Sequence, residues 1–170
     1  MKKFLALVLA LCMMIPFAAF ADETVKLGQV DYAAHGTKCF AVLTVAMQGD
    51  TIVAAYIDEF QFMDKDSAVG VPNSDASFGE SYPEGKVLAS KRVNTKLYSK
   101  NMTDHAGSTV ALADNYAAIE AYVTGKTIAE LEAELEGKTA EEMVDVVSGC
   151  TLVDTLGYVS GLLEAAKSVK

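Results

Sequence analysis

The sequence predicts one domain of the α+β class, with an antiparallel sheet early in the chain and helices late. Three observations support this class. Residues 37–62 are rich in β-branched and aromatic residues and are interrupted once, at Gln48-Gly49-Asp50. Residues 115–169 instead repeat apolar side chains at helical spacing. A chain of 170 residues, 51% hydrophobic and 22% charged, has the size and composition of one globular domain.

The first elements are expected to be strands. Residues 25–32 are predicted to form an edge strand, and His35-Gly36 marks the turn after it. Residues 37–47 and 51–62 follow with strand composition on either side of a glycine turn, which predicts an early β-hairpin.

A long loop is predicted after the hairpin. Residues 63–85 are rich in Asp, Ser, Gly, Pro and Asn, and ordered loops of this length often carry function. Residues 86–92 are then predicted to form a short strand that ends in the basic pair Lys91-Arg92. We expect this pair at the surface, at the end of the strand, with contact to a phosphate or an acidic partner as the alternative.

The rest of the chain is predicted to be helical. Asn94 or Thr95 is expected to cap a helix that runs to about His105, with Gly107 as its C-terminal glycine. Asp114 is expected to cap a helix over residues 115–124. An amphipathic helix is predicted over residues 152–169.

A repeated pattern punctuates these helices. Gly-Lys-Thr occurs at residues 125–127 and again at 137–139, each time with a glutamate three places after the threonine, Glu130 and Glu142. In each copy glycine ends one helix, and the threonine and glutamate begin the next as a capping box.

The charge of the chain excludes some partners. Acidic residues outnumber basic ones by 23 to 14, and the formal charge is −9. Binding to nucleic acid by phosphate neutralisation, or to an anionic membrane surface, needs the opposite balance. We therefore expect no nucleic acid among the partners.

The N-terminus has the pattern of a secretory signal peptide, residues 1–21. Lys2-Lys3 precedes an apolar run, and Ala19-Phe20-Ala21 offers small residues at the positions that a signal peptidase reads. Cleavage after Ala21 leaves one domain, residues 22–170, with 12 basic and 23 acidic residues and a formal charge of −11. We expect an extracytoplasmic chain, secreted, periplasmic or on the cell surface, with no membrane span after cleavage.

The cysteines and histidines predict no catalytic or metal site. Cys39 and Cys150 remain after cleavage, and their spacing matches no zinc or redox motif. They either form a disulfide or stay as buried thiols. His35 and His105 are the only histidines, which are too few and too far apart in sequence to predict a metal centre.

The segment before the last helix carries the most specific signal. It reads Asp145-Val146-Val147-Ser148-Gly149-Cys150-Thr151. This run resembles the covalent-flavin signature of the FMN-binding domain family, Asp-x-x-Ser/Thr-Gly-Ala-Thr, which is also found in subunits of sodium-pumping and Rnf-type redox complexes. The specific resemblance covers seven residues, with Cys150 in place of the alanine. The general order of elements, a hairpin, then helices, then the motif before the last helix, is also similar and covers most of residues 25–168.

The resemblance implies a function. In that family a flavin transferase joins the phosphate of FMN to the last threonine of the signature, here Thr151. Ser148, Gly149 and Cys150 are then expected to shape the phosphate loop, and Asp145 to orient it or to aid the transferase. Membrane or extracellular redox partners are implied, and the protein is an electron carrier more than a stand-alone enzyme.

An alternative stays open at the level of sequence. Asp154 would put negative charge near the phosphate, and a domain with this fold but no covalent flavin would be a non-redox binding or surface protein. In that case the motif is only a helix entry. The aromatic candidates for contact with a flavin ring are Phe60, Phe62, Phe78 and Tyr82, and the sequence singles out none of them.

Overall fold

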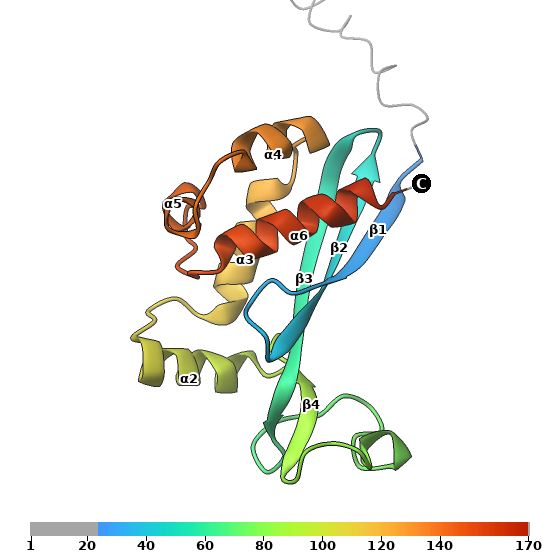
Figure 1. Cartoon of the computed structure of the whole chain (residues 1–170), viewed down its shortest axis with the longest axis vertical. Helices are drawn as coiled ribbons and strands as arrows, with labels where there is room; N and C mark the ends of the chain where they lie inside the picture. Colours follow the sequence, from blue (N-terminus) through green and yellow to red (C-terminus); the bar gives the residue numbers. More distant parts are fainter. Residues whose placement is uncertain (1–23, 170) are drawn as a thin grey trace, which may run out of the picture.

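The computed structural model describes residues 24–169, apart from the side chain of Asp145. The predicted signal peptide lies outside the described residues. The strands are β1 (Lys26–Tyr32), β2 (Cys39–Gln48), β3 (Thr51–Asp64) and β4 (Lys86–Ser90), and a 3₁₀ helix, η2 (Ser77–Gly79), precedes β4. The helices are α2 (Thr95–Ala106), α3 (Leu112–Val123), α4 (Ile128–Leu135), α5 (Ala140–Val146) and α6 (Thr155–Lys167). The α+β class and the early hairpin are confirmed (Figure 1).

The four strands form one antiparallel sheet in the order β1-β2-β3-β4. Leu43, in the middle of β2, lies opposite Val30 of β1 and Ile57 of β3. Burial alternates along β2, so that every second side chain, from Ala41 to Met47, faces the core. The hairpin turn depends on Gly49, whose φ of 62° is in the left-handed region.

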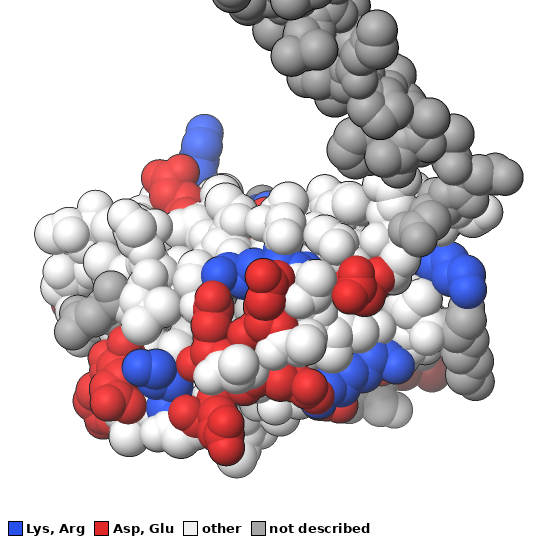
Figure 2. All heavy atoms as spheres, turned by 90° about the horizontal axis from the view of Figure 1, so that it is seen from above, with Lys and Arg blue, Asp and Glu red and all other residues white. Residues whose placement is uncertain are grey.

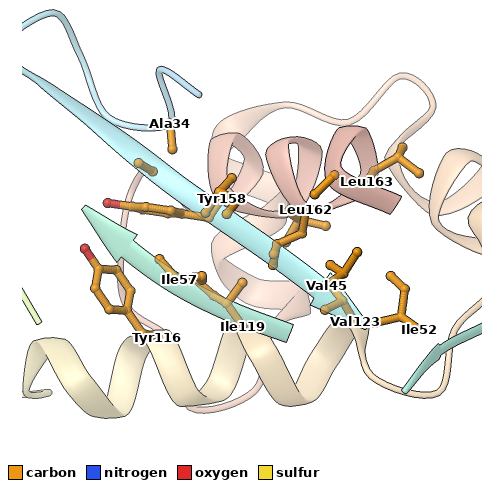
Figure 3. Packing of buried hydrophobic residues seen from close by; sticks show 14 of the residues in the cluster. Ala34, Val45, Ile52, Ile57, Tyr116, Ile119, Val123, Tyr158, Leu162 and Leu163 are labelled. Atoms are coloured by element: carbon orange, nitrogen blue, oxygen red, sulfur yellow. The ribbon is translucent and has the colours of Figure 1, made fainter. Parts of the chain in front are cut away.

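The helices cover one face of this sheet. α6 lies across β1 and β2, α3 packs along β3, and α4 and α5 pack against α6 (Figure 1). Two glycines let α6 approach closely. A Cβ atom at Gly157 would lie 2.3 Å from the carbonyl oxygen of Ala34, and one at Gly161 would lie 2.2 Å from Leu43 Cδ1. Figure 3 shows the apolar side chains that fill the space between α6, the strands and α3.

Two helix starts differ from the sequence prediction. α3 begins at Leu112, after the N-cap Ala111, so Asp114 lies inside the first turn instead of capping it. Leu112 is buried, and its N–H is bonded to Ser99 Oγ at 2.9 Å, so packing extends the helix. α6 begins at Thr155 and not at Leu152, because the hydroxyl of Thr155 donates to the Leu152 carbonyl at 2.5 Å and holds residues 152–155 in a turn.

The first predicted helix forms as expected over α2, with Gly107 at its C-cap in the left-handed conformation. Asn94 stands at its N-cap but makes no side-chain cap bond there. Its side chain instead bonds both the N–H and the carbonyl of Val69, at 2.8 and 2.9 Å. Asn94 therefore fastens the long loop to the start of α2.

Both predicted capping boxes are confirmed. The Thr127 hydroxyl accepts from Glu130 N and the Thr139 hydroxyl from Glu142 N, and each glutamate accepts from the N–H of its threonine in return. α4 and α5 thus begin where the Gly-Lys-Thr repeats predict.

The surface carries many acidic side chains. Figure 2, which looks down on one end of the molecule, shows several of them close together with basic side chains among them. Among the described helices, none is both long and apolar enough to cross a bilayer.

Candidate ligand cavity beside Thr151

A cavity of about 340 Å³ lies between α2 and the segment that leads into α6. Its walls are largely apolar and include Tyr98, Met102, Leu112, Leu152 and Tyr158. A volume near 300 Å³ is at the small end of the range for organic-ligand sites. Apolar walls with a few convergent polar groups are typical of such sites.

Thr151 lies at the rim of this cavity and is exposed to solvent. Asn115 of α3 fixes its position: the backbone N–H of Thr151 donates to Asn115 Oδ1 at 2.7 Å, and its hydroxyl donates to the same oxygen at 3.3 Å. Asn115 is fully buried, and its Nδ2 donates to the carbonyls of Val110 and Ala111 at 3.2 and 3.1 Å. The one hydroxyl that the motif predicts as an attachment point is therefore both oriented and accessible.

The other motif residues lie outside the cavity. Ser148 and Gly149 are exposed in the turn before it, and Gly149 has a φ of 86°, which favours glycine. Cys150 is buried against the core, with Sγ 3.1 Å from Thr155 Oγ1. The Cys150 thiol thus packs against the core and is not among the described residues that line the cavity. The side chain of Asp145 lies outside the described part of the chain.

A buried ion pair stands beside the cavity. Lys91 Nζ is paired with Glu59 Oε2, and the two side chains are only 1% and 0% exposed. Tyr158 donates to the same carboxylate oxygen at 2.9 Å, and Tyr116 is 3.4 Å from it. Figure 3 shows the hydroxyl groups of both tyrosines on the same side of the core. Lys91 also lies 4.5 Å from the centre of the Tyr98 ring.

The electrostatics keep these groups in fixed protonation states. Burial lowers the pKa of Lys91, but the charge and hydrogen bond of Glu59 outweigh it, so that the pKa is raised overall and the ammonium keeps its proton. Burial, together with the nearby Glu59 carboxylate, raises the pKa of Tyr116 and of Tyr158. Both tyrosines are therefore hydrogen-bond donors at neutral pH.

Both described cysteines are free thiols. Cys39 donates to the His35 carbonyl at 2.6 Å and lies 3.4 Å from Glu59 Oε1. Burial raises the pKa of Cys39 to about 11, with a smaller contribution from Glu59 and against an opposing one from Lys91. The Cys39 thiol is therefore a weak nucleophile near neutral pH.

His35 and Asp154 close one side of the cavity. His35 follows β1, Asp154 precedes α6, and His35 Nδ1 lies 2.5 Å from Asp154 Oδ2. Their side chains are 44% and 32% exposed. The pair joins the turn after β1 to the entry of α6, so Asp154 has a partner of its own beside Thr151.

Sequence reasoning missed the polar part of this site. The prediction of a surface pair at Lys91-Arg92 was wrong, because Lys91 is buried on Glu59 and Arg92 is largely buried on Glu120. A signal was present in the sequence, since Glu59 is two residues from the buried Ile57 and strand alternation puts both on the inner face. Asn115 had no comparable signal.

The four aromatic candidates lie elsewhere. Phe60 stacks on Phe40, and Phe62 and Phe78 pack around Tyr82 beside the long loop. The cavity instead takes its aromatic rings from Tyr98 and Tyr158. The larger hollow of about 810 Å³ in the long loop is lined by Tyr82 but brings no comparable buried charge to its wall.

Comparisons of the chain with family models, with curated proteins and with solved structures find no match. The resemblance of residues 145–151 to the flavin signature therefore remains a prediction, and the geometry around Thr151 is the independent observation to set beside it.

Proposed function

We propose that this protein is an extracytoplasmic electron carrier that holds FMN through a phosphoester bond to Thr151. The observation that carries the proposal is the position of Thr151, exposed at the rim of a cavity of about 340 Å³ and oriented by the buried Asn115. The proposed location outside the cytoplasm rests on the signal-peptide pattern of residues 1–21.

The chemistry of the cavity suits the group. A flavin ring is flat and largely apolar on its faces, and Tyr98, Met102 and Leu112 supply apolar wall. Cys150 leaves the phosphate region free because its thiol is buried on Thr155. Asp154 is the unfavourable charge at the rim, and its contact with His35 reduces that effect.

Each residue then has a stated task. Thr151 Oγ1 would form the bond to phosphorus and give up its proton to a base of the transferase, which would supply FMN as a phosphoric anhydride; the anhydride P–O bond would break and the second phosphate group would leave with the electron pair. Asn115 would hold the backbone of Thr151 in place before and after attachment. The turn at Ser148 and Gly149 would be the exposed feature that a transferase meets. Bound FMN supplies one- and two-electron transfer, while the protein contributes position, electrostatics and control of solvent access.

Intact mass and in-gel flavin fluorescence test the proposal. The protein is produced together with a flavin transferase, exported, and purified as the mature chain. We expect a mass increase equal to FMN less water, and fluorescence that stays with the denatured band. Thr151→Val removes the only oxygen that can form the bond, so both signals should disappear while the circular dichroism spectrum stays the same.

Two matched variants complete the test. Thr151→Ser keeps a hydroxyl at the same place and should keep some covalent flavin. Thr37→Val changes an exposed threonine that does not line the cavity and should be fully modified. An unmodified wild-type mass, or flavin retained by Thr151→Val, would refute attachment at this residue. The unmodified mass would favour the non-redox binding protein, whereas retained flavin would place the bond at another residue.

A further inference from the structure

We propose that Lys91 gives the cavity a fixed positive charge that makes it bind the reduced, anionic flavin ring more tightly than the neutral oxidised ring. This inference rests on the proposed function, because it assigns a role to Lys91 toward the group attached at Thr151. The carrying observation is that the cavity wall includes Lys91, whereas its partner Glu59 is not among the described residues that line it.

The ion pair is a fixed dipole. Glu59 is 0% exposed and accepts a hydrogen bond from Tyr158 at 2.9 Å, with Tyr116 and Cys39 each 3.4 Å away. Of the two charged residues, Lys91 contributes to the cavity lining and Glu59 does not, so the cation is the member of the pair that borders the ligand space. A fixed dipole of this kind cannot reorient when the charge of a ligand changes.

Burial makes this charge effective. Lys91 is 1% exposed, so little water screens it from a ligand in the cavity. The opposing charge on the wall is Asp154, which is 32% exposed and in contact with His35. Solvent and the histidine both weaken the field of Asp154 inside the cavity. Glu59 offsets part of the Lys91 field, but it is not among the described residues that line the cavity, so the balance at the wall favours a negative ligand.

A flavin ring changes charge on reduction. Two electrons and one proton convert the neutral oxidised ring into a reduced ring with one negative charge. In the experiment below the electrons come from dithionite and the proton comes from the buffer. A site that binds the anion more tightly raises the midpoint potential, and for a two-electron couple each tenfold preference is worth about 30 mV.

The first measurement needs only the wild-type protein loaded with FMN. Its midpoint potential, from spectroscopic titration at pH 8 with dithionite and a reference dye, is compared with that of free FMN. We expect the midpoint potential of the bound flavin to be more positive by at least about 30 mV, which corresponds to a tenfold tighter binding of the reduced ring. A potential equal to or below that of free FMN would overturn the inference. Absence of bound flavin would instead refute the proposed function, so the two failures are distinguishable.

Paired substitutions then assign the effect. Lys91→Met with Glu59→Gln removes both charges from the buried pair and leaves the formal charge unchanged, and we expect the tenfold preference to be lost. Lys126→Met with Glu134→Gln makes the same two changes in a pair joined at 2.6 Å that lies outside the cavity lining, and it should keep the wild-type potential. Equal shifts in both variants, or none in the first, would overturn the role of Lys91. If the first variant does not fold, the wild-type comparison decides alone.

Discussion

Replacing Lys91 by Met should destabilise the protein more than almost any other single change. Methionine keeps the length and packing of the lysine stem but leaves the Glu59 carboxylate buried without its cation. The donors that remain are the Tyr158 hydroxyl at 2.9 Å and the more distant Tyr116 hydroxyl at 3.4 Å, because the Cys39 thiol donates its proton to the His35 carbonyl. Because one good hydrogen bond cannot replace a full charge, we expect a loss of about 3–5 kcal/mol in the free energy of unfolding.

The double variant separates two contributions to this loss: the loss of the ion pair itself and the cost of leaving the Glu59 carboxylate buried without a partner. With Lys91→Met and Glu59→Gln together, no unpaired charge is buried, and an amide can still accept from Tyr158. Replacing a whole buried pair by neutral groups is often close to neutral for stability. We therefore expect the double variant to be more stable than Lys91→Met alone, and to lie within about 2 kcal/mol of wild type.

Urea unfolding followed by far-ultraviolet circular dichroism at pH 7 measures these differences. A loss below about 1 kcal/mol for the single variant, or a double variant less stable than the single one, would refute this reasoning.

Two further predictions test packing and thiol chemistry. Gly157→Ala should lower the free energy of unfolding by about 1–2 kcal/mol in urea melts, because the new Cβ would lie 2.3 Å from the rigid Ala34 carbonyl oxygen. This loss is expected even though alanine favours the helix by about 1 kcal/mol over glycine. An unchanged or higher stability would contradict the close approach of α6. Iodoacetamide at pH 8 should label Cys39 at least about tenfold more slowly than free cysteine, and the labelling rate should rise as the pH approaches the Cys39 pKa of about 11. Cys150 is buried and should react only after unfolding. Rapid labelling of two thiols in the folded protein would contradict this prediction.

The elements that sequence predicted best are those whose signals are local. The two capping boxes place both partners three residues apart, so Thr127 with Glu130 and Thr139 with Glu142 are legible without any tertiary structure. The hairpin is legible for the same reason, because a glycine turn and strand composition stand next to each other. Where the prediction erred, at the start of α3, the burial of Leu112 outweighed the capping preference of Asp114.

The candidate site could be predicted from the sequence only in part, because its contacts are long-range. The motif pointed to Thr151, but the residue that orients it, Asn115, is 36 positions away. Tyr158 and Glu59 are 99 positions apart, and only the packing of α6 on the sheet brings them together. A charged residue on the inner face of a strand can be recognised from alternation, whereas the identity of its partner cannot.

The position of the buried pair separates a structural role from a functional one. An ion pair removed from water stabilises a fold weakly, and apolar residues of similar volume commonly do as well. If Lys91 and Glu59 served packing alone, the middle of the apolar core would suit them no worse than its edge. They lie instead beside the cavity that Thr151 borders, with Lys91 among its lining residues and Glu59 accepting from the Tyr158 hydroxyl. Packing does not require that the cation be the member of the pair at the cavity, whereas a ligand that gains negative charge would be stabilised by it. The midpoint potential of the protein loaded with FMN is therefore a sharper test of Lys91 than stability.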